Sequence, residues 1–168
     1  MDGGDAMFDI YTIGAEVLRG KAGPVERFDA RLAAAASAMH ETMTRGRGIG
    51  LAGPQVGLSE RLFVVHVEGD KPRTFVNPEI LATSPELSTF EEGCLSIPGV
   101  YADLKRPEYV KVQAWNEKGR PFTLEADGLL ARVIQHEFDH LDGVLFTDRL
   151  PERVRDRLLA QYEKRMRA

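Results

Sequence analysis

The sequence lacks the features that mark several classes of protein. It has one cysteine among 168 residues, so no disulfide can form within the chain and the usual signature of an oxidising compartment is missing. No apolar run approaches the roughly 18 residues that cross a bilayer, and the longest, such as Leu62 to Val67, suits a buried strand. Residues Met1 to Ala6 carry acids and glycines where a secretory signal would carry basic residues. We therefore expect a cytoplasmic protein with no membrane partner.

The chain also has little net charge and no internal division. Its net charge of −4 gives no overall positive field for nucleic acid, and we expect no DNA partner. Hydrophobic residues make up 43% and charged residues 29%, close to ordinary globular proteins, which excludes fibrous and disordered classes. No repeat and no Ser-, Gln- or Pro-rich linker interrupts the sequence. Residues 1–168 are therefore predicted to form a single domain.

The spacing of apolar residues predicts helices at both ends of a set of strands. The predicted helices run from Pro24 to Met43, from the N-cap Asp127 to a stop at Gly143, and from Glu152 to Arg167. The predicted strands are Arg61 to Val67, Thr74 to Asn77, Glu86 to Phe90, Val110 to Asn116 and Pro121 to Glu125. The glycine-rich segment from Gly46 to Gly57 is predicted to be a loop. This order indicates an α+β fold, with antiparallel sheets packed around the central second helix, an N-terminal helix and a C-terminal helix.

The most informative motif lies on the second predicted helix. His136-Glu137-Phe138-Asp139-His140 places two imidazoles four residues apart, about 1.1 turns, so both project from one face and can reach one ion. Glu137 lies beside them and can accept a proton from a water molecule that the ion activates. The motif predicts a metal-dependent hydrolase. Two histidines and a glutamate that are merely solvated on a helix are the alternative.

A catalytic metal site of this kind usually has three protein ligands and one open position, so a third ligand is needed. His40 on the first predicted helix and His66 in an apolar strand are more typical of surface or core histidines. Cys94 is the better candidate, because it follows a predicted strand at Gly93, where the backbone can turn and a thiolate can point inward. An inert buried cysteine is the alternative.

Three segments, taken together, resemble the signature of the peptide deformylase family. They are, in order, Gly48-Ile49-Gly50-Leu51-Ala52-Gly53-Pro54-Gln55, Glu92-Gly93-Cys94-Leu95-Ser96 and Gln135-His136-Glu137-Phe138-Asp139-His140-Leu141. The similarity extends to Val17-Leu18-Arg19, Val76-Asn77-Pro78 and Gly143-Val144-Leu145-Phe146, so it covers nearly the whole chain. The resemblance implies an enzyme that removes the formyl group from the N-terminal formylmethionine of nascent polypeptides and releases formate.

The resemblance also implies how a metal would be held. One divalent ion would be bound by Cys94, His136 and His140, and in the family this ion is generally Fe(II), with Zn(II), Ni(II) or Co(II) able to replace it. A ligand set of one thiolate and two imidazoles suits either iron or zinc. Glu137 would take a proton from water and give it to the departing amine.

Other residues match positions that contact the substrate or the transition state. The side chain of Gln55 and the backbone N–H of Leu95 match the donors that stabilise the oxyanion. Ile49 and Gly50 match positions beside the substrate, where the main chain of Gly50 can pair with an extended peptide.

Two positions depart from the most common family pattern. Gly53 stands where alanine is common, and we expect a modest effect on loop stability without loss of chemistry. Tyr101 stands where some members carry an arginine that could meet the substrate backbone.

Leu129 and Val133 could line a methionine pocket, although ordinary core packing explains them equally well.

The C-terminal segment is basic within an acidic chain. Residues 149–168 contain seven basic and three acidic side chains, which a solvated amphipathic helix explains, and a transient ribosome contact is a weaker hypothesis.

Two other functions remain as alternatives. A zincin-like metallopeptidase shares the H-E-x-x-H motif, but a cysteine ligand and a short chain leave little room for a two-lobed cleft. A non-catalytic, metal-binding, ribosome-associated protein would need neither Glu137 nor Gln55.

Overall fold

The computed structural model describes residues 8–168, and the prediction for Met1 to Ala6 lies outside the described residues. The helices are α1 (Ala30–Arg45), α2 (Gly128–Leu141) and α3 (Glu152–Arg167). The strands are β1 (Gly50–Ala52), β2 (Leu62–Val65), β3 (Arg73–Thr83), β4 (Leu87–Cys94), β5 (Ile97–Pro107), β6 (Tyr109–Trp115) and β7 (Pro121–Asp127). Short 3-10 turns lie at Glu16–Leu18, Gly53–Val56 and Phe146–Arg149. Among these described residues, no helix has the length and apolar character needed to span a membrane.

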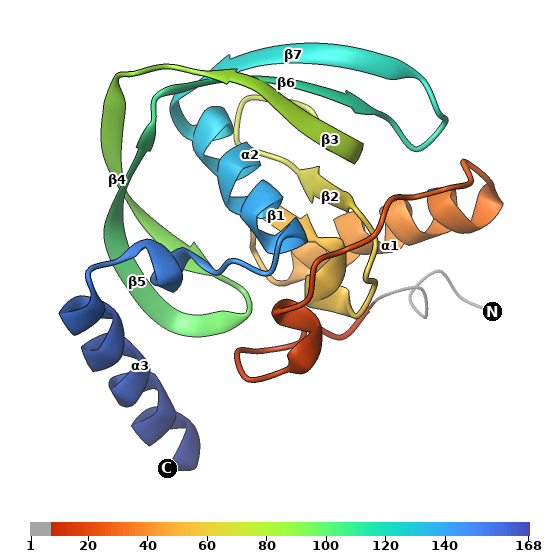
Figure 1. Ribbon diagram of the computed structural model, residues 1–168. Helices are drawn as coiled ribbons and strands as arrows, with labels where there is room; N and C mark the ends of the chain where they lie inside the picture. Colours follow the sequence, from red (N-terminus) through yellow and green to blue (C-terminus); the bar gives the residue numbers. More distant parts are fainter. Residues whose placement is uncertain (1–7) are drawn as a thin grey trace.

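The strands form two antiparallel sheets on either side of α2 (Figure 1). One sheet has five strands in the order β1-β2-β3-β6-β7, and the other is the hairpin of β4 and β5. In Figure 1, α2 lies between the larger sheet and this hairpin, while α3 extends away beneath the hairpin. The α+β prediction, with antiparallel sheets around the second helix, is therefore confirmed.

The central position of α2 follows from its apolar face. Ala131, Ile134 and Leu141 are fully buried in one cluster with Phe75 and Val112 of the larger sheet. Burial of each large aliphatic side chain contributes about 1.5–3 kcal/mol. The polar residues of the H-E-x-x-H motif are buried as well, so α2 is covered on nearly all sides. Its polar face must therefore be satisfied by partners from the β4–β5 hairpin.

The first helix begins later than predicted. It starts at Ala30 rather than Pro24, and Asp29 caps it by accepting a hydrogen bond from the backbone N–H of Leu32 at 3.1 Å. Residue Val25, which fits the helical spacing, is instead bound to Asn77 through its own backbone: its N–H donates to Asn77 Oδ1 (2.8 Å) and its carbonyl accepts from Asn77 Nδ2 (2.9 Å). This contact between residues 52 positions apart keeps Val25 out of the helix, although its apolar spacing predicted helical structure there.

The predicted strands were located correctly but are incomplete. No strand was predicted where β5 lies, because β5 contains Pro98, Gly99 and Pro107 and forms by pairing with β4. The predicted loop from Gly46 to Gly57 contains β1 and a 3-10 turn. The third helix is confirmed at its predicted bounds, and the second ends at Leu141, two residues before Gly143.

Gly53 allows two backbone segments to approach closely. A Cβ atom at this position would lie 2.7 Å from the carbonyl oxygen of Glu60 and 2.8 Å from that of Leu58. Real Cβ contacts are longer than this, so an alanine would force the backbone apart. Packing between residues 53 and 60 thus explains the glycine, and the size of the effect on loop stability stays a prediction.

His40 generates a prediction about pH. It is partly buried on α1, where Nε2 lies 3.0 Å from Thr74 Oγ1, and burial lowers its pKa, with Glu117 opposing and His66 adding to the shift. The unfolded state therefore takes up a proton at higher pH than the folded state, so stability declines as pH falls below about 6.5. The variant His40→Gln should show a smaller loss of unfolding free energy between pH 7.5 and pH 5.5 in urea titrations. An equal loss in both proteins would contradict the assignment.

Candidate metal centre

The structure brings the three predicted metal ligands together. Cys94 is the last residue of β4, and His136 and His140 lie one turn apart on α2. Their ligand atoms all lie within 4.8 Å of one another, and Cys94 Sγ is 3.4 Å from His140 Nε2. The other two histidines, His40 and His66, are bound elsewhere, to Thr74 and to the backbone of Asp70.

This cluster has the chemistry of a cation site. Burial and the neighbouring His136 lower the pKa of His140 well below its ordinary value, so His140 is neutral and offers a lone pair. Burial also disfavours a charged His136, but Cys94, Glu137 and Glu92 together raise its pKa well above the ordinary value. The residues around His136 therefore stabilise a positive charge at this point of the cluster, as a site for a cation requires. One sulfur and two nitrogen donors fit a divalent transition metal and leave further positions open.

Glu137 lies beside the cluster with little hydrogen bonding. Its Oε2 is 3.9 Å from His136 Nε2, and its buried Oε1 has no hydrogen-bond partner among residues 8–168. Burial raises its pKa to about 7, with His136 opposing and Glu92 adding to the shift. A Cβ at Gly50 would lie 2.5 Å from Glu137 Oε2, so the carboxylate rests directly against the Gly50 backbone. A carboxyl with this pKa can both accept and return a proton near neutral pH.

Gln55 is held in one orientation. Its Oε1 accepts a hydrogen bond from the backbone N–H of Ala52 at 2.9 Å. Its Nε2 donates to Ser96 Oγ at 3.1 Å and points toward Cys94 Sγ at 3.5 Å. Because the carbonyl end is occupied by a backbone donor, the N–H₂ end faces the metal cluster. Gln55 is buried in the short 3-10 turn that follows β1.

A cavity of ≈ 590 Å³ adjoins the cluster. It is lined by most of the predicted site residues: Ile49, Gly50, Gln55, Cys94, Leu95, His136 and Glu137. Leu129 and Val133 of α2 also line it, and Leu129 is 44% exposed, so core packing alone does not explain that side chain. Tyr101, which is 60% exposed, lines the cavity where its ring lies against Gly93. His140, which is fully buried, is outside the lining.

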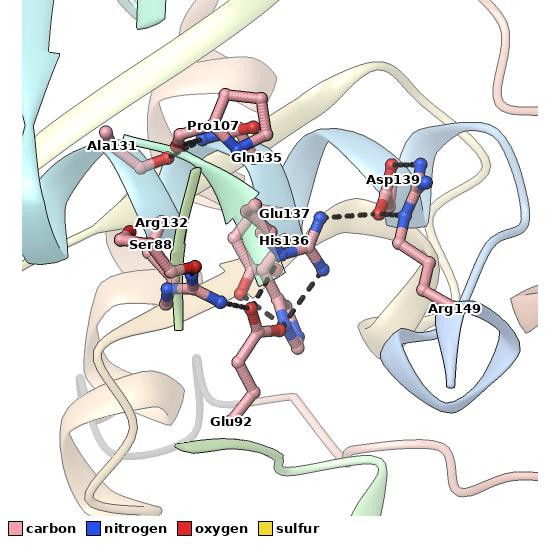
Figure 2. A network of polar contacts seen from close by, with 11 residues as sticks. Ser88, Glu92, Pro107, Ala131, Arg132, Gln135, His136, Glu137, Asp139 and Arg149 are labelled. Atoms are coloured by element: carbon pink, nitrogen blue, oxygen red, sulfur yellow. Dashed lines mark hydrogen bonds and ion pairs between the residues drawn. The ribbon is translucent and has the colours of Figure 1, made fainter. Parts of the chain in front are cut away.

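Sequence reasoning did not assign a role to the charged network that holds His136 (Figure 2). Glu92 Oε1 lies 2.9 Å from His136 Nδ1, so the imidazole is oriented with Nε2 toward the cluster. The same carboxylate accepts hydrogen bonds from Arg132 and from Arg106, whose Nε is 2.6 Å from Glu92 Oε2. Burial works against the charged form of Glu92, but His136 and Arg106 lower its pKa to about 2. Glu92 is therefore an anion in the folded protein.

The network continues through Arg106 to the other end of α2. Arg106 Nη1 donates to Asp139 Oδ2 at 3.0 Å. Arg149 Nε donates to the same oxygen at 2.6 Å, and Figure 2 shows Arg149 beside Asp139. Arg106 thus joins β5 both to Glu92 of β4 and to Asp139 inside the H-E-x-x-H motif. Its side chain is 4% exposed, so each of its bonds is made away from water.

Some of this network was accessible to sequence reasoning. Glu92 and Asp139 lie inside the second and third signature segments, and Arg132 lies four residues before His136, on the same face of α2. Arg106 had no local signal, because it lies in the strand that the pattern missed and meets Glu92 only after the hairpin pairs.

We predict that Glu92→Gln weakens both stability and metal binding. The amide leaves Arg106 and Arg132 buried beside a neutral group, and breaking one partner of such a pair costs roughly 3–5 kcal/mol. Urea titration should show this loss, and the variant should also release its metal to a chelator faster than the native protein. Glu86→Gln, at an exposed glutamate of the same hairpin region, is the control and should be unchanged. A Glu92→Gln protein of native stability would contradict the network's importance.

The fold and the cluster define an α+β protein with a candidate Cys-His-His metal site on an H-E-x-x-H helix, and comparison with known proteins specifies the family. Residues 7–156 match the family model described as polypeptide deformylase. A peptide deformylase of Treponema pallidum is 52% identical over 139 residues, which cover 83% of this chain and 85% of the relative. One of Neisseria meningitidis is 46% identical over 164 residues, covering 96% of this chain and 98% of the relative.

Solved structures agree with the sequence relatives. A peptide deformylase of Legionella pneumophila superposes with a TM-score of 0.91 at 40% identity, covering 96% of each chain. One of Synechococcus elongatus in complex with actinonin gives 0.88 at 46% identity, covering 92% of this chain and 86% of that one. The chain belongs to the polypeptide deformylase family.

Proposed function

We propose that this protein is a metal-dependent peptide deformylase that hydrolyses the N-terminal formyl group of formylmethionine on nascent polypeptides, giving formate and a free amine. The observation that carries the proposal is the convergence of Cys94, His136 and His140 beside a cavity that Glu137 and Gln55 also line. Membership of the family supports the same reaction. We propose further that residues 1–168 act as a single catalytic domain in the cytoplasm, where nascent chains are made.

The ligand set supports a resident divalent metal. Cys94, His136 and His140 would hold it, and the bound ion would act as a Lewis acid that activates water and polarises the formyl oxygen. We propose Fe(II) as the ion, with Zn(II), Ni(II) or Co(II) as functional replacements, because a thiolate and two imidazoles are of mixed softness.

Glu137 is proposed to move the proton. As the water oxygen bonds to the formyl carbon, the Glu137 carboxylate accepts the proton that water loses. When the carbon–nitrogen bond breaks, Glu137 returns this proton to the amine nitrogen, so the carboxylate is regenerated. Burial raises the pKa of this carboxyl, which makes it a better proton acceptor than an exposed glutamate.

Gln55 and Leu95 are proposed to stabilise the negative charge that develops on the formyl oxygen. The amide N–H₂ of Gln55 is held toward Cys94 by the bond between its carbonyl and Ala52. The backbone N–H of Leu95 follows Cys94 directly in the turn between β4 and β5. Donors that are fixed before the reaction need no reorganisation in the transition state.

The substrate peptide is proposed to lie along β1. Ile49 and Gly50 line the cavity at the beginning of this strand, which is an edge of the five-stranded sheet. The main chain of Gly50 could then pair with an extended peptide. Leu129 and Val133 supply apolar surface on the opposite element, α2, where a methionine side chain would be desolvated.

The proposal predicts formate release from formyl-Met-Ala-Ser by protein purified without oxygen. Glu137→Gln should lower kcat by about 10²- to 10⁴-fold, and Gln55→Ala by about 10²- to 10³-fold, because each removes a group that acts in the transition state. Both variants should still bind one metal equivalent, as metal analysis would show. A chelator should abolish activity, and added Fe(II) should restore it.

Casein offered beside the formylated peptide distinguishes this function from a peptidase. Cleavage of casein without formate release would favour the zincin-like alternative. Metal binding without either reaction would favour the non-catalytic alternative.

We also propose a transient ribosome contact through the basic face of α3. Arg157 and Arg167 are exposed on this helix, whose last turn is rich in basic residues. The double variant Arg157→Glu/Arg167→Glu should co-sediment less with ribosomes at low salt, because contacts with RNA phosphates depend on positive charge. If this variant co-sediments with ribosomes as much as the native protein does, the proposed ribosome contact is wrong. The proposed deformylase function would still stand.

A further inference from the structure

The hairpin that carries Cys94 is irregular beside that residue. Gly93 pairs with Tyr101, whereas the next residue, Cys94, pairs with Ile97. Pro98, Gly99 and Val100 therefore fall between two consecutive pairings and form a bulge in β5. Bulges of this kind bend a strand and leave backbone groups outside the regular ladder, so they need other support.

The bulge forms part of the cavity wall. Pro98 and Gly99 line the cavity together with Cys94, Leu95 and Tyr101. A shift of the bulge would therefore change the shape of the cleft next to the metal ligand, without moving the histidines on α2.

Arg165 of α3 supports the bulge directly. Its Nη2 donates a hydrogen bond to the carbonyl oxygen of Pro98. Gly99 has a φ of 79°, and a Cβ there would lie 2.7 Å from Arg165 Nη2 and 3.0 Å from Cζ. The guanidinium thus packs against the bare Gly99 backbone, and the positive φ of this residue also favours glycine.

The arginine is itself held in place. Its Cζ lies 5.5 Å from the centre of the Tyr162 ring, one turn earlier on α3, and Tyr162 is buried. Tyr162 belongs to one apolar cluster with Ile97, which precedes the bulge, and with Val100, the last residue of the bulge. The C-terminal helix therefore contacts the bulge through an apolar anchor and a charged hydrogen bond.

We propose that Arg165 is a positioning residue for substrate binding, which fixes the Pro98–Gly99 bulge as a wall of the cleft. The inference rests on the proposed deformylase function. Arg165 is not among the residues that line the cavity, so it acts through the bulge. Its loss should weaken binding of the peptide and leave the chemical step intact.

The test uses the full-length metal-loaded protein and the uncharged substrate formyl-Met-Ala-Ser-amide, which removes any attraction between Arg165 and a terminal carboxylate. Arg165→Gln should raise KM roughly threefold to tenfold, the size expected for one lost hydrogen bond. Its kcat should stay within about twofold, because no transition-state contact is removed. Arg165→Lys, which keeps a donor and the charge, should recover part of the KM. Arg153→Gln, an exposed arginine on the same helix with the same loss of charge, should match the native protein.

Hydrogen exchange provides a readout that does not depend on turnover. Arg165→Gln should speed exchange of amides in residues 97–104, while Arg153→Gln leaves them unchanged. Unchanged exchange in Arg165→Gln would overturn the proposal, and so would faster exchange with a native KM. Absence of formate release by the native protein would instead overturn the proposed function, so the two failures are distinct.

Discussion

The buried bonds between Glu92 and its basic partners are the interaction on which the rest of the site depends. The α2 helix carries polar residues on a face that is covered by the β4–β5 hairpin, and such a face is stable only if its charges are paired. Glu92 meets this need from β4 by binding Arg132 and His136 of α2 at once, and Arg106 completes the pairing from β5. The hairpin and the helix are thus held in one fixed relation.

That fixed relation also determines the geometry of the candidate metal ligands. Cys94 lies two residues after Glu92 on the same strand. Because the Glu92 side chain binds His136, β4 also brings the thiol of Cys94 to α2. The Glu92 carboxylate binds Nδ1 of His136 and so orients the imidazole, which leaves Nε2 free to face the cluster. The same contacts therefore provide both the stability of the fold and the preorganisation of the site.

The elements around this centre divide the remaining tasks. The larger sheet buries the apolar face of α2 and presents β1 at the cavity, so Gly50 lies against Glu137. The 3-10 turn after β1 fixes Gln55 by a bond within its own segment. From the other side, α3 supports the bulge in β5 through Tyr162 and Arg165.

The sequence by itself determined the features that depend on local spacing. The interval between His136 and His140 required a shared helix face, the bounds of the third helix followed from its apolar period, and the signature segments implied the candidates Gln55, Cys94 and Glu137. Only the tertiary structure decided the features that depend on distant partners. Asn77 keeps Val25 out of the first helix, β5 exists because β4 pairs with it, and Arg106 finds Glu92 and Asp139 across the core. These contacts leave no local pattern, because neither partner's sequence neighbourhood encodes the position of the other.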